Sequence, residues 1–199
     1  SIEAKLEQIT SLASENKFKD AATLSETMLK TSKDPILLFA AGMLNFCTRD
    51  LDKSRHFFKK LALIEQENTT ARLMLYIIDW IKSREQANAF TRNLFAMDWH
   101  EEDEFLGYLA TVLKDKKRID FRFIDYENSS EKSWRLFIEG LIAEKNNELQ
   151  YARKMFKQSI LNAGINDWTY FLSFSRLNHI SKEDFEAFRQ QARNQRESA

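Results

Sequence analysis

The sequence predicts an all-α protein in which about six antiparallel helix–turn–helix hairpins stack one after another. Three observations lead to this prediction. The 199 residues include only four Gly and one Pro, whereas strand-rich folds need glycine in their tight turns. Apolar residues recur at the spacing of one face of a helix rather than on alternate positions. The same arrangement of small and apolar residues also returns about every 33 residues, which is typical of stacked-repeat proteins.

The repeat is marked by one position on the second helix of each hairpin, where a small residue would let two helices cross closely. These positions are Ala21, Ser54, Ala87, Ile119, Ala152 and Phe185. The intervals between them are 33, 33, 32, 33 and 33 residues. Three of the four glycines, Gly42, Gly107 and Gly140, stand twelve residues before a marker. An irregular bundle of helices of similar length is the alternative, but the fixed period favours repeats.

We expect a single domain over residues 1–199, with units at about 2–34, 35–67, 68–99, 100–132, 133–165 and 166–199. In the second unit, Pro35 should begin the first helix, where a missing backbone N–H costs nothing. Residues 48–52 should form its turn, with Asp50 or Asp52 capping the second helix. In the fifth unit, Asn146 and Asn147 should occupy the equivalent turn.

The fourth unit contains a charge pattern and one ambiguous segment. Its acidic run, residues 101–104, should begin a helix, and the basic residues Lys114 and 116–118 should end it, since these charges offset the helix dipole. Residues 119–126 alternate apolar and polar side chains as a strand does. A lone strand would leave its backbone groups unpaired among helices, so we expect a short or irregular helix there.

Two stretches resemble the tetratricopeptide repeat (TPR) family. Residues 136–160 carry Gly140, Ala152 and Phe156 at the family's positions, and the second unit carries Gly42, Ser54 and Phe58. The usual spacing in the family is one residue longer, and the closing proline is mostly absent here. Ankyrin repeats share the period but not the Thr-Pro-Leu-His signature. The TPR resemblance implies a right-handed superhelical solenoid.

The resemblance also implies that the first helix of each unit lines a concave groove that binds partners. The candidate partner-binding residues in that register are Phe39, Met43, Phe46, Tyr76, Tyr108, Trp134, Phe137, Leu141, Tyr170 and Phe174. Packing in the core between helices is the alternative for each of them. Some family members clamp a terminal carboxylate with basic groove residues, but only Arg72 suits that task here. An apolar and aromatic groove is better matched to a hydrophobic peptide or an amphipathic helix.

The sequence carries few signals for catalysis, cofactors or metals, and we expect none of the three. The glycines are too scattered for a phosphate-binding loop, and His56, His100 and His179 lack ligand spacing. Cys47 is the only cysteine, which excludes an intrachain disulfide. The balance of 30 basic and 30 acidic residues argues against nucleic acid as a partner, and no apolar run is long enough for membrane insertion.

These observations predict a non-enzymatic scaffold that binds a peptide or protein segment in its groove. Two alternatives remain open. One is a chaperone or assembly factor for a secretion or envelope complex, and the other is a self-assembling scaffold that forms homo-oligomers. The single cysteine fits the cytoplasm, but the chain begins at Ser1 rather than Met. A periplasmic or membrane-anchored location after removal of an upstream signal or anchor is therefore also left open.

Overall fold

The computed structural model describes residues 1–84, 104–115, 129–164 and 167–198. Within these ranges the regular structure is α-helix without any strand, which confirms the all-α prediction. The expectations for residues 85–103, for 116–118 and for the ambiguous segment 119–126 lie outside the described residues. The chain divides into two compact units, Ser1–Thr111 and Val112–Ala199. A single domain over the whole chain stays a prediction.

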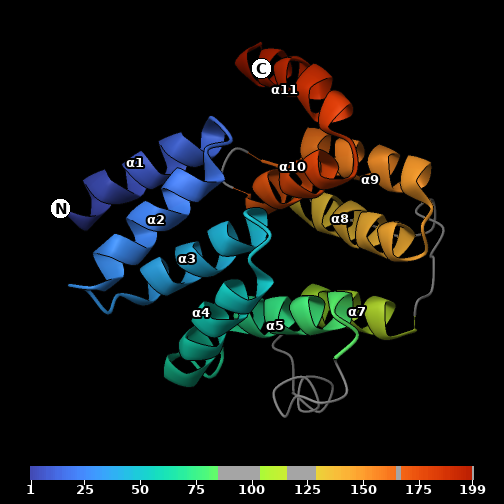
Figure 1. The fold of residues 1–199 in the computed structure, drawn as a ribbon. Helices are drawn as coiled ribbons and strands as arrows, with labels where there is room; N and C mark the ends of the chain where they lie inside the picture. The colour runs from blue at the N-terminus through green and yellow to red at the C-terminus, as the bar shows by residue number, and fades with distance from the viewer. Residues whose placement is uncertain (85–103, 116–128, 165–166, 199) are drawn as a thin grey trace. The chain divides into compact units, whose positions relative to one another are not determined.

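The first unit contains two hairpins and the first helix of a third. Its helices are α1 (Ile2–Ser14), α2 (Phe18–Leu29), α3 (Pro35–Cys47), α4 (Leu51–Ile64) and α5 (Thr69–Ile81). Each of them packs against the next along the chain, as can be followed from blue to green in Figure 1. The boundary between the two units falls within α7 (Glu104–Asp115).

The second unit contains two complete hairpins. Its helices are α8 (Ser129–Lys145), α9 (Leu149–Asn162), α10 (Trp168–Ile180) and α11 (Lys182–Glu197). Besides the contacts between consecutive helices, α8 contacts α10 and α9 contacts α11. The first helices of the two hairpins therefore touch each other, and so do the second helices, as in stacked hairpins.

Local signals in the sequence set three of the helix starts in the first unit, those of α3, α4 and α5. Pro35 occupies the first turn of α3, and the Asp34 carboxylate accepts a hydrogen bond from the Ile36 N–H at 3.0 Å. Asp50, one of the two predicted caps, accepts from the Lys53 N–H at 3.1 Å and so caps α4. Asn68 caps α5 in the same way. These side chains bond backbone N–H groups that have no partner inside the helix.

The predicted close crossings are present in both units. The Ser54 hydroxyl donates a hydrogen bond to the Gly42 carbonyl at 2.6 Å, so α4 lies against the backbone of α3. A Cβ atom at Gly42 would lie 2.8 Å from the Phe58 ring, and one at Gly140 would lie 2.5 Å from the Phe156 ring. Both distances are too short for real carbon contacts. The glycines are there because a phenylalanine of the facing helix fills the space of their missing side chain.

The same backbone turn follows four helices, α1, α3, α5 and α8, each of which is the first helix of a predicted hairpin. Asn16, Arg49, Ser83 and Asn147 follow α1, α3, α5 and α8 with positive φ angles of 60°, 70°, 55° and 59°. In each case the next residue donates its N–H to a carbonyl five residues earlier, as in Lys17 to Leu12 at 2.9 Å and Glu148 to Ala143 at 2.8 Å. This is the Schellman arrangement, which satisfies carbonyls at a helix end.

The turns recur with the period predicted from the side chains. The intervals between the four left-handed residues are 33, 34 and 64 residues, the last being close to two units. The hairpin of α10 and α11 differs, because Ser181 ends α10 with an extended φ of −157°. After α1, α3 and α5 the backbone turn therefore returns close to the predicted spacing, whichever sequence template is chosen.

Replacing Ser83 by Gly should stabilise the protein by about 0.5–1 kcal/mol. Ser83 is exposed and holds a left-handed conformation that costs an L-residue more than it costs glycine. Chemical denaturation followed by circular dichroism measures the change. Ser83→Ala is the matched control, because it keeps the Cβ atom and should give no gain. A Ser83→Gly variant that is less stable than the parent would contradict the assigned turn.

Candidate functional site

The ten candidate partner-binding residues fall into two groups by burial. Three keep exposed area, and they are Phe39, Tyr108 and Trp134. The other seven are buried, and they are Met43, Phe46, Tyr76, Phe137, Leu141, Tyr170 and Phe174. The buried side chains pack in the core, which is the alternative that the sequence left open for each of them. In this structure they present little surface to a partner, so the candidate site is built on Phe39, the one of the three partly exposed residues that lines the hollow described next.

A hollow of about 340 Å³ opens in the first unit between the start of α3 and the connection from α4 to α5. We call it the α3–α5 hollow, and the residues that line it are Asp34, Pro35, Ile36, Phe39, Glu65 and Asn68. Phe39 is the one predicted partner-binding residue among them. The hollow therefore lies between the start of α3 and the start of α5, which are the first helices of two successive predicted units.

Helix caps fix the polar wall of the α3–α5 hollow. Asp34 is held by its bond to the Ile36 N–H at the start of α3. Asn68 accepts from the Ala71 N–H at 2.9 Å and donates through Nδ2 to the Glu65 carboxylate at 2.9 Å. The two carboxyl groups are therefore oriented by backbone-anchored bonds, and a partner would find them in place.

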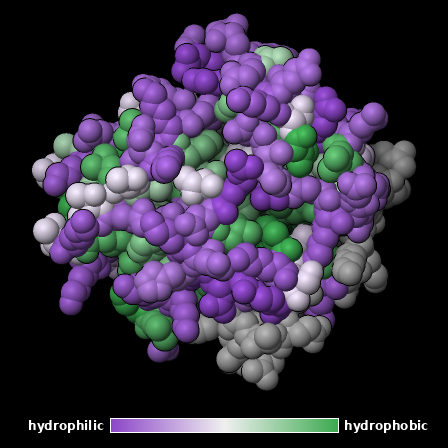
Figure 2. Space-filling view, in the orientation of Figure 1, coloured by the Kyte–Doolittle hydropathy of each residue, from purple (hydrophilic) through white to green (hydrophobic). Residues whose placement is uncertain are grey.

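The apolar part of the hollow is unusually exposed for this chain. Ile36 is 49% exposed, and Phe39 is partly exposed while its ring meets Phe58 edge-on at 6.0 Å. Leu63 and Ile64, which precede Glu65 in the chain but do not line the hollow, are 61% and 58% exposed. Figure 2 shows hydrophobic surface at the lower left, over this end of α4. Large apolar side chains gathered on a surface commonly mark a binding area.

The charge of the hollow is negative. Its two ionisable lining residues are Asp34 and Glu65, and none of the described residues that line it is basic. Arg72, the one groove position suited to a carboxylate clamp, directs its Nε atom to the Gln66 carbonyl at 2.8 Å and does not line the hollow. The arrangement favours a cationic and apolar ligand over an anionic one.

Two observations on the described residues concern thiol reactivity and metal binding. Cys47 is buried, and that burial raises the pKa of its thiol far above the usual range, so the reactive thiolate is scarce at neutral pH. No group of three or more His, Cys, Asp or Glu side chains in the described ranges is placed to hold a metal ion. None of the helices that the structure describes is long and apolar enough to cross a membrane.

Sequence reasoning found Phe39 but missed the rest of the hollow. Asp34, Glu65 and Asn68 come from short segments, and each has a signal of its own as a helix-end residue. What the sequence lacked was their closeness, which depends on how α3 and α5 pack around α4. No protein family, curated protein or solved structure matches the chain. Its function is therefore proposed from its own residues.

Proposed function

We propose that the chain is a non-enzymatic, TPR-like repeat protein that binds a segment of another protein. In this proposal its hairpins, about six, form a right-handed solenoid. The observation that supports it best is the Schellman turn, which returns after α1, α3, α5 and α8 at intervals of 33, 34 and 64 residues. The glycine–phenylalanine crossings at Gly42 and Gly140 support it from the side chains.

The α3–α5 hollow is proposed as one anchor point for the partner segment. Ile36 and Phe39 would receive an aliphatic side chain, and the carboxylates of Asp34 and Glu65 would pair with a nearby Lys or Arg of the same segment. Charge and shape therefore select a segment in which an apolar residue is followed or preceded by a basic one. This chemistry matches an amphipathic helix or an extended peptide laid across the first helices.

The energies show that the hollow cannot act alone. Burying one Leu side chain gives about 1.5–3 kcal/mol, and an exposed ion pair adds about 0.2–1 kcal/mol. A micromolar complex needs about 8 kcal/mol even before the entropy lost on association is counted. The partner must therefore touch further positions, and the hollow serves as a specificity pocket within a longer contact.

The experiment measures binding of short labelled peptides that carry a Leu and a Lys one helical turn apart. We expect Phe39→Ala and Glu65→Gln each to weaken binding about fivefold, roughly 1 kcal/mol, and peptides with Lys changed to Glu to bind worst. Phe57→Ala is the matched control, because Phe57 is a partly exposed α4 aromatic outside the hollow. Peptide binding that survives Phe39→Ala but is lost in Phe57→Ala would overturn the site.

A further inference from the structure

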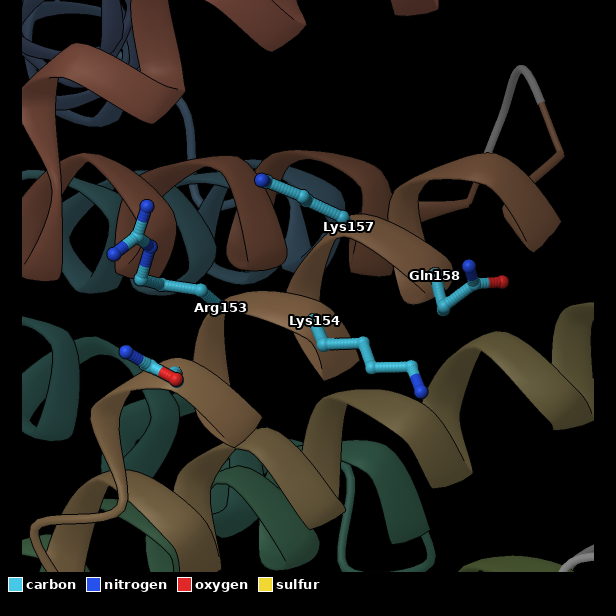
Figure 3. Close-up of a pocket in the computed structure, with 5 residues that line it drawn as sticks. Arg153, Lys154, Lys157 and Gln158 are labelled. Carbon is cyan, nitrogen blue, oxygen red and sulfur yellow. The ribbon is translucent and has the colours of Figure 1, made fainter.

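The second unit carries a basic strip on α9. Its members, which we call the α9 strip, are Gln150, Arg153, Lys154, Lys157 and Gln158, and they line a hollow of about 350 Å³. Figure 3 shows Arg153 and Lys157 extending to one side of the helix, with Lys154 and Gln158 extending to the other. Every lining side chain carries hydrogen-bond donors, and three of them are cations.

One side of the α9 strip already holds a carboxylate. Arg153 Nε lies 2.5 Å and Lys157 Nζ 3.0 Å from the same oxygen of Asp184, in the first turn of α11. These bonds lower the pKa of Asp184, and the bond to Asp184 raises the pKa of Arg153. Asp184 therefore shows that Arg153 and Lys157, one helical turn apart, can bind a single carboxyl group together.

The other side of the strip carries a positive charge that no nearby carboxylate of the described residues neutralises. Lys154 is exposed and has no carboxylate within 4.0 Å among the residues that the structure describes. Gln150 and Gln158 are exposed beside it. Three cations thus face one directly bonded carboxylate, and the strip keeps a local positive excess although the chain as a whole is neutral.

We propose that the α9 strip is a second binding surface, one that takes an acidic peptide segment. One carboxylate of the segment pairs with Lys154, and a second competes with Asp184 for Arg153 and Lys157. From Gln150 to Gln158 the strip is about 12 Å long, which matches about four residues of extended peptide. Two Glu or Asp side chains within that length can reach both sides of the helix.

The neighbouring acids favour a peptide over a nucleic acid. Asp184 is bonded to two of the residues that line the hollow, and Glu183 is close enough to act on the charge of Arg153. A continuous line of phosphates would be repelled at these positions, whereas a peptide can place carboxylates only where cations are. Because Lys154 is exposed and Arg153 and Lys157 keep about a third of their side-chain area in contact with solvent, at 38% and 33% exposure, binding should weaken with added salt.

The test uses the full chain and a labelled peptide with two Glu residues four positions apart, followed by fluorescence anisotropy at low salt. Lys154→Glu should weaken binding about tenfold, which corresponds to about 1.4 kcal/mol. Asp184→Asn should strengthen binding several-fold, because it removes the competing carboxylate. Lys59→Glu is the control, since Lys59 is an exposed α4 lysine outside the strip.

Three outcomes would overturn the proposal. The first is an equal loss in Lys154→Glu and Lys59→Glu, which indicates attraction to overall charge only. The second is weaker binding in Asp184→Asn while its helicity is unchanged. The third is tighter binding of a single-stranded DNA oligonucleotide than of the peptide, lost in Lys154→Glu, which would assign the strip to nucleic acid. If Asp184→Asn loses helicity, the comparison of Lys154 with Lys59 decides.

Discussion

Replacing Glu139 by Leu is expected to lower the free energy of unfolding by about 3–5 kcal/mol. The Glu139 carboxylate accepts from Arg135 Nη2 at 2.6 Å within α8, and both side chains are buried, at 1% and 0% exposure. The variant leaves a guanidinium in the core without this carboxylate. A charge taken out of water without its partner is among the costliest single changes to a protein. Urea denaturation followed by circular dichroism measures the loss.

Two variants test whether burial causes this loss. Glu15→Leu removes the carboxylate of an exposed pair with Lys17, and we expect little change in stability from it. Arg135→Met combined with Glu139→Leu removes both buried charges and should be more stable than Glu139→Leu alone. The explanation fails if the double variant is as unstable as the single one, or if Glu15→Leu costs as much as Glu139→Leu.

Replacing Phe137 by Ala is expected to cost about 3–5 kcal/mol, because it empties a fully buried aromatic site. The Phe137 ring lies 6.0 Å from that of Trp134 and 6.2 Å from that of Phe156, so several ring contacts are lost together. Phe39→Ala should cost only about 1–2 kcal/mol, since less area is removed from the core. Thermal unfolding of the two variants measures the difference.

The same two variants separate core from binding surface. Phe39→Ala should fold normally and bind the Leu–Lys peptides less well. Phe137→Ala should lose stability, and any effect on binding should follow its loss of folded protein. If Phe137→Ala remains as stable as the parent and loses peptide binding, Phe137 belongs to the binding surface and its assignment to the core is wrong.

The predictions that the structure confirms were made from local features of the sequence. Pro35 at a helix start and Asp50 as a cap depend on bonds within a few residues, so the sequence alone was sufficient for them. The crossing at Gly42 was also predicted, because a small residue that recurs at one position of a repeat indicates close packing of two helices there. The left-handed residues were harder to foresee, because Arg49 and Ser83 stand where glycine would have signalled the turn.

Which of the candidate partner-binding residues are exposed and which are buried could not be predicted from periodicity. Phe39 and Phe137 occupy the same register in two units, yet the first is partly exposed and the second is fully buried. Spacing along a helix says which residues share a face but not what covers that face. Likewise, the pairing of Arg153 with Asp184 joins residues 31 positions apart, and it depends on how α11 packs against α9.

The order of helix contacts has a consequence for how the molecule comes together. Within each unit, a helix packs mainly against its neighbours along the chain, so the loops that must close during folding are short. Proteins with such low contact order reach the native state quickly. The terminal helix α1 rests chiefly on α2, so its amide protons should exchange with solvent before those of α3.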